Sequence, residues 1–334
     1  MPTRTSHNFR PDDASLKGLQ ERLLAWFRET ARDLPWRHTH DPYRILVAEV
    51  MLQQTQVERV IPFYTAFLDA FPTLESLAVA STADVIRQWA GLGYNRRAVN
   101  IQRAARTVCG PYGGRFPQTV ADLQKLPGIG PYTAGALASF AFGQDAACID
   151  ANIRRVLRRC LVGPEPDSSV VRERVLLDLA QSLVPPGHGG VWNQAMMELG
   201  ALVCVAGTPV CQRCPLRDHC RTFAMATAQA PSSGASAAST TASATTFALR
   251  RPARRVAEPR APFYGSNRYY RGRVVDRLRT LPPDATIPFD QLGPQVKETY
   301  TPDEQDWLRD LVGGLVRDGL VEIVGDAVRL PPGS

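Results

Sequence analysis

Apolar positions over the first two thirds of the chain recur at the spacing of an α-helix. The pattern is clearest between residues 16 and 27, where apolar side chains return every three or four positions, as on the buried face of an amphipathic helix. Strand-like alternation is scarce up to about residue 223, so residues 16–223 are predicted to be all-α. Further helices are expected over residues 43–54, 62–71, 82–91, 96–112, 120–126, 131–142, 152–161, 169–183 and 192–205.

The pattern changes after residue 223. Residues 226–246 are almost all Ala, Ser, Thr and Gly. Such a stretch buries too little apolar surface to offset the entropy lost on ordering, so we expect a flexible linker. Beyond it, ten arginines lie between residues 250 and 279, interleaved with Phe and Tyr. A basic segment with aromatic side chains is typical of a surface that holds nucleic acid.

The end of the chain carries a mixed pattern. Helical spacing over residues 271–281 and 303–318 is followed by two short β-like runs, 320–324 and 327–330, around a Gly-Asp turn. Two helices followed by a β-hairpin is the order of a winged helix. We therefore expect a small winged-helix-like α/β unit at the end of a mainly α chain.

The charge favours a polyanionic partner, although a basic enzyme with no such partner would carry the same excess. Lys and Arg outnumber Asp and Glu by 39 to 32, a formal net charge of +7. No apolar run reaches the ~20 residues that span a bilayer, so no membrane partner is expected. The N-terminus is polar and lacks the apolar core of a signal peptide. The expectation is therefore a cytoplasmic, nucleoid-associated protein.

Four of the seven cysteines lie close together, with the spacing C-x6-C-x2-C-x5-C: Cys204, Cys211, Cys214 and Cys220. Apolar packing does not require this spacing, whereas thiolates so close in sequence can converge on one metal centre. A zinc ribbon usually shows two C-x-x-C knuckles. One knuckle with compact loops fits a [4Fe–4S] cluster held by four thiolates better, and zinc is the alternative.

A glycine hairpin joins two expected helices over residues 126–134. Gly128 and Gly130 would allow a close backbone approach, with free amides at the start of the next helix. Such a site binds a phosphate oxygen without reading base sequence. The simpler alternative is an ordinary turn between two helices.

Two carboxylates are candidates for the chemistry. Glu49 lies inside an apolar helical run, where burial would raise the pKa of its carboxyl, as a general acid needs; its alternative is a surface-facing side chain. Asp150 opens another expected helix, where capping is the simplest role. A carboxylate there would also stabilise a cation that develops nearby.

The order of these motifs resembles the endonuclease III superfamily of helix-hairpin-helix glycosylases. The resemblance rests on E-V-M-L-Q-Q-T-Q-V at 49–57, L-P-G-I-G-P-Y-T-A at 126–134, I-D-A-N at 149–152 and the cysteine spacing. Within the superfamily, the first motif is similar to the adenine DNA glycosylases, as are L-P-W-R at 34–37, G-L-G-Y at 91–94 and N-Q-A-M-M-E-L-G-A-L-V-C at 193–204. The resemblance covers about residues 16–223.

The resemblance implies a two-lobed helix-hairpin-helix DNA glycosylase fold and a monomer that acts on double-stranded DNA containing a mispair. The DNA would be kinked and the target adenine flipped into the cleft between the lobes. The expected organisation is a disordered tail (1–14), a helical-barrel lobe (36–145), an iron–sulfur lobe (15–35 and 146–223), a flexible linker (224–249) and a basic winged-helix-like module (250–334).

The resemblance also implies roles for single residues. Glu49 corresponds to the acid that protonates the departing adenine, and Asp150 to the carboxylate that stabilises the sugar oxocarbenium or bonds to it. Members that also cut the strand carry a lysine after the hairpin, which forms a Schiff base; Tyr132 stands there in this chain, so it should be monofunctional. Asn152 and Tyr132 match residues that line the catalytic pocket, and Arg37 and Gln194 match residues that contact the adenine. The residues that match those wedging the duplex and touching the opposing 8-oxoguanine are Gln54, Thr55, Leu92 and Tyr94.

The sequence departs from the family pattern in three places. Asn95 follows Tyr94 where a second tyrosine is usual, and Ala151 stands where glycine is common, as in mismatch thymine glycosylases. The C-terminal segment does not resemble the nucleotide-hydrolase-like domain that recognises 8-oxoguanine. A thymine or uracil mismatch glycosylase is therefore the nearest alternative. A non-catalytic iron–sulfur DNA-binding protein is a third, although it predicts loss of Glu49 and Asp150, and both are present.

Overall fold

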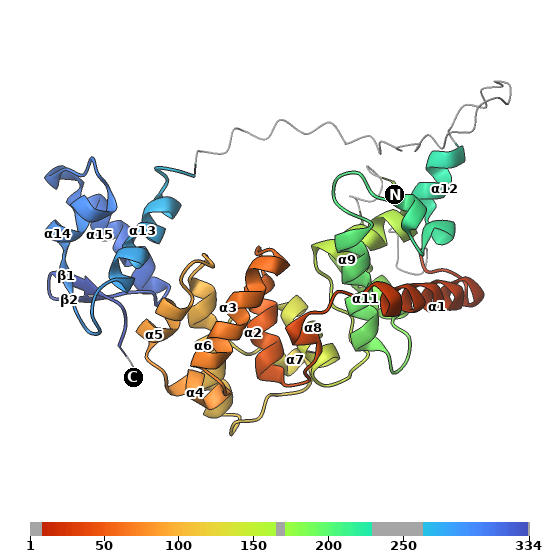
Figure 1. Ribbon diagram of the computed structural model, residues 1–334, viewed down its shortest axis with the longest axis horizontal. Helices are drawn as coiled ribbons and strands as arrows, with labels where there is room; N and C mark the ends of the chain where they lie inside the picture. Colours follow the sequence, from red (N-terminus) through yellow and green to blue (C-terminus); the bar gives the residue numbers. More distant parts are fainter. Residues whose placement is uncertain (1–8, 165–170, 229–262, 333–334) are drawn as a thin grey trace. The chain divides into compact units, whose positions relative to one another are not determined.

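The computed structural model describes residues 9–164, 171–228 and 263–332, which form two compact units. We call them the cysteine unit (Met1–Asp33 with Pro131–Val256) and the barrel unit (Leu34–Gly130 with Ala257–Ser334). Most of the expected tail and linker lies outside the described residues. The prediction of a mainly α chain that ends in a small α/β unit is confirmed (Figure 1).

The cysteine unit is helical throughout its described residues. Its core joins apolar side chains of the first helix to those of the helices after residue 150. Helices α9 and α11 pack closely, since a Cβ on Gly200 would lie 2.6 Å from the Cβ of Asn152. The helices are α1 (Asp13–Thr30), α8 (Pro131–Phe140), α9 (Ala151–Leu157), η3 (Arg158–Val162), α10 (Glu173–Leu183), α11 (Gly189–Leu202), η5 (Cys211–Arg213), η6 (Arg217–His219) and α12 (Arg221–Ala228).

The barrel unit surrounds a core that includes Phe67, Trp89 and Ile101. Helix α6 packs against α2, α4 and α5, so it is the central element (Figure 1). Its helices before the hairpin are η2 (Pro35–Arg37), α2 (Pro42–Leu52), α3 (Val57–Ala70), α4 (Leu74–Val79), α5 (Thr82–Gln88), α6 (Arg96–Cys109) and α7 (Val120–Leu123).

The C-terminal module, which we define as residues 263–332, forms the rest of the barrel unit. Its three strands make one antiparallel sheet in the order β1-β3-β2, with Ile323 opposite Val328 in the terminal hairpin. The expected helices and hairpin are therefore present. The elements are α13 (Asn267–Arg279), β1 (Ile287–Pro288), α14 (Phe289–Val296), η7 (Pro302–Glu304), α15 (Gln305–Arg317), β2 (Glu322–Val324) and β3 (Ala327–Arg329).

Several element boundaries differ from the expected ones. Helix α3 begins at Val57, so Pro62, the expected start, lies inside the helix, where it has no amide hydrogen to donate to the preceding turn. Helix α12 continues to Ala228, so the first residues of the expected linker are helical. Helix α1 begins at Asp13, capped by Asp12, within the expected tail. Over the described residues, no helix is long and apolar enough to cross a bilayer.

Candidate active site

Helix α2 carries Glu49 into the interior of the barrel unit. The side chain of Asp41 caps the helix by accepting from the Tyr43 amide at 2.8 Å, and Pro42 occupies the first helical position. The residues around Glu49 on α2 are buried, and Glu49 itself is 5% exposed. The alternative of a surface-facing Glu49 is therefore excluded. A carboxyl inside the unit is the placement that the expected general acid requires.

Just beyond Glu49, the end of α2 is held by a buried arginine that the sequence analysis missed. Arg97 is 9% exposed, and its Nη1 donates to the carbonyl oxygens of Val50 at 2.8 Å, of Met51 at 3.0 Å and of Gln53. These carbonyls belong to the last turn of a helix, which lacks intrahelical donors and favours a cation. Burial lowers the pKa of Arg97 to about 10, so the guanidinium is still protonated at neutral pH.

The same arginine joins two segments that were predicted to contact DNA. Its Nη2 donates to Thr55 Oγ1 at 3.3 Å, and to the carbonyl oxygens of Leu92 and Gly93, each at 3.2 Å. The Gln54–Thr55 turn and the Leu92–Tyr94 loop are thus held side by side. The burial of Arg97, though not its partners, could have been predicted from the sequence. Arg97 follows the helical spacing of Ile101 and the other buried residues of α6.

The Gln54–Thr55 turn and the Leu92–Tyr94 loop each contain a residue with strained backbone. Among described non-glycine residues, positive φ occurs at Gln54 (57°), Tyr94 (47°) and Asp284 (61°). Such conformations persist where the surroundings fix them, and they gather at functional sites. Gln54 is exposed and Tyr94 is 45% exposed, whereas Leu92 is 6% exposed. Tyr94 and Gln54 are therefore the side chains of these segments that a ligand can reach.

Asp150 caps α9 and also holds a neighbouring candidate. Its Oδ1 accepts from the Ile153 amide at 2.7 Å, and its Oδ2 accepts from Asn152 Nδ2 at 2.8 Å. The capping role is thus real. It does not exclude a catalytic one, because each carboxylate oxygen has a second lone pair. Asp150 belongs to the cysteine unit and Glu49 to the barrel unit.

A second arginine that the sequence analysis missed connects Asn152 with the cysteine loop. Arg155 Nη2 donates to Asn152 Oδ1 at 2.8 Å and to the Gly200 carbonyl oxygen at 2.6 Å, and its Nε donates to the Cys204 carbonyl oxygen at 2.6 Å. The orientation of the Asn152 amide, and through it of Asp150, therefore depends on backbone at the first cysteine. No spacing in the sequence distinguishes Arg155 from its neighbouring arginines.

The geometry of the hairpin explains why glycine stands in it. Gly128 has φ of 75°, and a Cβ there would lie 2.6 Å from the Cβ of Asn100 on α6. A Cβ on Gly130 would meet nothing within 4 Å, so the backbone at Gly130 is open to approach. The turn therefore needs glycine at position 128 and leaves backbone accessible at the start of α8, as a phosphate site requires.

The remaining candidates lie on separate elements. Arg37 ends η2 and is half-buried, as is Gln194 on α11. Tyr132 lies in the first turn of α8, with its hydroxyl 4.0 Å from the Met197 sulfur on α11. Tyr132 and Gln194 belong to the cysteine unit and Arg37 to the barrel unit.

The four cysteines line one cavity, together with Arg159 and apolar side chains of α12. Arg159 Nη1 donates to Cys204 Sγ at 3.6 Å. Burial raises the pKa of the thiols of Cys204 and Cys211, and that of Cys214 to about 12. The spacing read from the sequence thus brings four sulfur atoms to one place, beside a cation that would balance thiolate charge.

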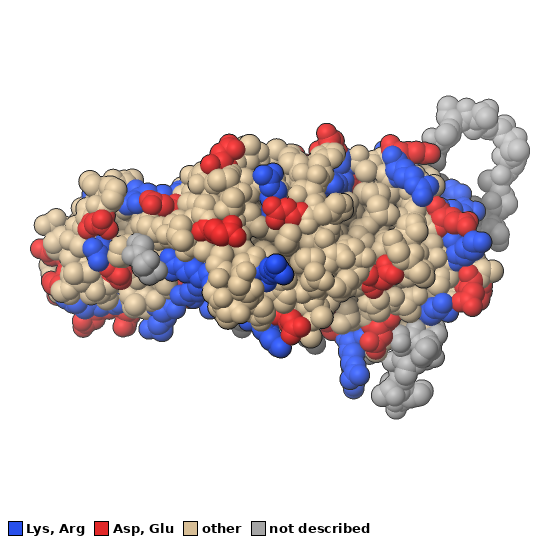
Figure 2. Space-filling view, turned by 90° about the horizontal axis from the view of Figure 1, so that it is seen from below, with Lys and Arg blue, Asp and Glu red and all other residues tan. Residues whose placement is uncertain are grey.

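The distribution of charge gives a weaker signal than these sites. On the face drawn in Figure 2, Lys and Arg side chains are interspersed with Asp and Glu. A mixed surface of this kind provides little attraction for a polyanion, so a nucleic-acid interface has to be argued from particular side chains.

Comparison with known proteins gives matches over both units. Residues 47–180 match the HhH-GPD superfamily of base excision DNA repair proteins. A solved structure of a thermostable thymine-DNA glycosylase is 31% identical, with a TM-score of 0.60, and covers 64% of this chain and 98% of that one. A DNA-bound endonuclease III is 23% identical, with a TM-score of 0.54 and coverage of 64% and 97%; this likeness shows the fold alone.

Two curated relatives are similar over different lengths. An adenine DNA glycosylase of Homo sapiens is 46% identical over 225 residues, 64% of this chain, and the chain spans only 41% of that relative. An adenine DNA glycosylase of Mycolicibacterium smegmatis is 37% identical over 306 residues, 91% of this chain and 92% of the relative. The unmatched 9% is about 30 of 334 residues, so the second match extends into the C-terminal module. With this identity over nine tenths of both chains, the chain belongs to the adenine DNA glycosylase family.

Proposed function

We propose that this protein is a monofunctional DNA glycosylase that excises adenine mispaired with 8-oxoguanine or guanine. The observation that carries the proposal is the burial of Glu49 on α2, within the motif that resembles the family's acid and next to the strained Gln54–Thr55 turn. The family membership of the chain supports adenine as the leaving base.

In the proposed reaction, the bond between adenine and the sugar breaks and a water molecule adds to the sugar carbon. The Glu49 carboxyl donates a proton to the departing base, which would otherwise leave as an anion. The Asp150 carboxylate stabilises the oxocarbenium cation that develops on the sugar. Its bonds from Ile153 N and Asn152 Nδ2 fix the carboxylate in advance, so it need not reorganise as charge develops.

Exposed side chains of the barrel unit would contact the duplex. Tyr94 and Gln54 would reach the opposing base and its neighbours, with Leu92 packed beneath them. The open backbone at Gly130 would bind a phosphate oxygen. Arg37, Tyr132, Asn152 and Gln194 would line the adenine pocket, as their motifs imply. The C-terminal module, with the arginine-rich segment before it, would add further contacts to the DNA backbone.

We propose that Cys204, Cys211, Cys214 and Cys220 hold a [4Fe–4S] cluster. Within the described residues, no group of three or more His, Cys, Asp or Glu side chains is arranged to hold a single metal ion. The four thiols line one cavity, and their spacing in the sequence, with one C-x-x-C knuckle and compact loops, favours a cluster over zinc. Bound by these four thiolates, a cluster would hold rigid the loop that carries Arg213 and Arg217.

Purified protein is therefore expected to be brown and to contain about four irons per chain. Metal analysis by inductively coupled plasma spectrometry, together with visible absorbance, measures both. Cys214→Ser should lower the iron content, whereas Cys109→Ser, at a cysteine outside the set, should leave it at the wild-type value. Colourless, active protein with one zinc per chain would contradict the cluster.

A thymine or uracil mismatch glycosylase is the second candidate. The 31% identity to a thymine-DNA glycosylase favours it, and so does Ala151. Excision assays on A:8-oxoguanine, A:G, T:G and U:G duplexes separate the two candidates. Faster release of thymine or uracil than of adenine would overturn the adenine proposal.

The same assay, run with and without alkali, tests the monofunctional mechanism. No strand cleavage is expected without alkali or heat, since the phenol of Tyr132 cannot form the imine that a lysine amine forms. Borohydride reduction should trap no covalent complex between protein and DNA. A trapped adduct would contradict the monofunctional assignment. It would not decide whether adenine is excised, which the excision assay measures.

A further inference from the structure

The C-terminal module shares its core with helices α5 and α6. Ala83, Ile86 and Val99 belong to the same buried cluster as Val275 and Leu278 of α13. The Ala83 amide also donates to the Pro331 carbonyl oxygen at 2.9 Å. The module is therefore packed on the α5–α6 pair and not merely attached to it by the preceding segment.

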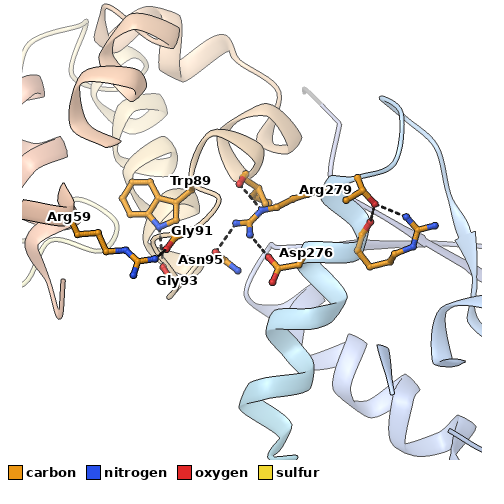
Figure 3. A network of polar contacts seen from close by, with 10 residues as sticks. Arg59, Trp89, Gly91, Gly93, Asn95, Asp276 and Arg279 are labelled. Atoms are coloured by element: carbon orange, nitrogen blue, oxygen red, sulfur yellow. Dashed lines mark hydrogen bonds and ion pairs between the residues drawn. The ribbon is translucent and has the colours of Figure 1, made fainter. Parts of the chain in front are cut away.

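Arg279 at the end of α13 extends this contact to the loop after α5. Its side chain is 9% exposed, and it donates from Nε to the Ile86 carbonyl oxygen at 3.0 Å and from Nη2 to Asn95 Oδ1 at 2.8 Å (Figure 3). Asp276 on the same helix accepts from its Nη1 at 2.6 Å and fixes the guanidinium plane. Because all three guanidinium nitrogens of this buried arginine donate hydrogen bonds, its side chain is held rigidly and supports Asn95.

A second arginine of α13 contacts the neighbouring tyrosine. The guanidinium carbon of Arg268 lies 4.6 Å from the centre of the Tyr94 ring and 5.8 Å from that of Phe263, both within the range of a cation–π contact. Tyr94 has positive φ, which a non-glycine residue adopts only where its surroundings fix it. The module supplies part of those surroundings.

The barrel helices hold the other half of the same loop. Arg97 donates to the Leu92 and Gly93 carbonyl oxygens. Trp89 Nε1 donates to the Gly93 carbonyl oxygen at 3.1 Å, and Arg59 to that of Gly91 (Figure 3). The backbone of the Gly91–Asn95 loop is thus fixed from the barrel side, and the Asn95 side chain from the module side. The Tyr94 ring is contacted from both, by Arg268 of the module and by Arg97 of α6, whose guanidinium carbon is 5.5 Å from the ring centre.

We propose that the C-terminal module positions the Gly91–Asn95 loop, with Arg279 and Arg268 as its positioning residues, and thereby sets which base opposite the adenine is accepted. This inference rests on the proposed function. It also accounts for Asn95, where the family pattern has a second tyrosine. The amide oxygen of asparagine accepts from Arg279, and a tyrosine ring would not place an acceptor at that point.

The test uses the full chain with Arg279→Met, Asn95→Ala and the double variant. Arg309→Met is the matched control, because it removes the same charge from the module and its partners, Asp326 and the Phe289 ring, lie within the module. Hydrogen exchange of the amides of residues 91–95 reports the loop without DNA. Single-turnover excision of adenine opposite 8-oxoguanine and opposite guanine reports discrimination.

Both single variants should speed exchange in residues 91–95 and change the ratio of the two excision rates by about tenfold, the size of one hydrogen bond to a charged group. The double variant should change the ratio no further than the larger single effect, since both remove the same contact. Arg309→Met should keep the wild-type ratio.

An unchanged ratio in both single variants would overturn the proposal, as would a loss of the same factor on both duplexes. Strictly additive effects would overturn it as well. If the wild-type protein excises no adenine from either duplex, the proposed function fails by itself. The exchange measurement then still decides whether the module holds the loop.

Discussion

Glu49→Gln is expected to abolish adenine excision while leaving DNA affinity close to that of the wild type. An amide fills the same space, but it cannot donate an acidic proton to the departing base. General acid catalysis contributes about 10²–10⁴-fold, so the single-turnover rate should fall by at least the lower of these factors. Excision is measured with enzyme in excess over an A:8-oxoguanine duplex, and affinity by titration of the same duplex.

Glu75→Gln is the matched control for this experiment. Glu75 is an exposed carboxylate in the first turn of α4, in the same unit as Glu49. Glu75→Gln makes the same chemical change at an exposed position, so the excision rate of this variant should equal that of the wild type. If Glu49→Gln excises adenine within threefold of the wild-type rate, Glu49 is not the acid. If Glu49→Gln loses both excision and affinity for DNA, the role of Glu49 is structural.

The residues that the sequence identified are those whose chemical type alone carries information. An acidic residue in an apolar run, a carboxylate before a helix and four cysteines in a short stretch are visible in a single chain. The structure shows Glu49 buried and Asp150 at its cap, and it brings the four cysteines to one cavity. Each expectation needed only local spacing, because the partners lie within one element or loop.

The sequence could not identify residues whose partners are backbone carbonyls of distant segments. Arg97 bonds to a carbonyl 47 positions away, Arg155 to one 49 positions away and Arg279 to one 193 positions away. Every residue has a carbonyl, so no pattern of residue types indicates which ones an arginine will reach. The amphipathic spacing of α6 indicated that Arg97 is buried, but not what it holds.

The same limit applies to helix α14. The sequence analysis expected no helix over residues 289–296, yet α14 runs through both Gly293 and Pro294. A Cβ on Gly293 would lie 2.4 Å from the Tyr300 ring, so glycine is required there by packing and not by a turn. Tertiary contact therefore overrode helix propensity at this point.

The second large effect is expected from Arg97→Met, which should lower both the thermal stability of the protein and its excision rate. Methionine keeps the apolar part of the side chain but removes the Arg97 donor from the carbonyls of Val50, Met51 and Gln53. Val50 then keeps only a 3.3 Å bond from the Gln53 amide and Gln53 only a 3.4 Å bond from Thr55 Oγ1, while Met51 has no other donor in the described residues. A buried polar group left without its partner costs about 1–3 kcal/mol, and Arg97 donates to more than one such carbonyl, so the loss should be about 3 kcal/mol in all. At roughly 2–4 °C per kcal/mol for a unit of this size, Tm should fall by about 10 °C.

Two further variants separate the charge of Arg97 from its shape. Arg96→Met removes the neighbouring charge on α6, whose one ion pair, to Asp318 at 3.4 Å, is exposed, so its Tm should change by about 1–2 °C. Arg97→Lys keeps the charge but has a single nitrogen. It can reach either the end of α2 or the Leu92–Gly93 carbonyls, and not both. Lysine should therefore recover part of the stability, while excision stays low because one of the two DNA-contact segments is still unsupported. If lysine restores excision fully, the charge alone is what the two segments need, and the bridging role of the guanidinium is wrong.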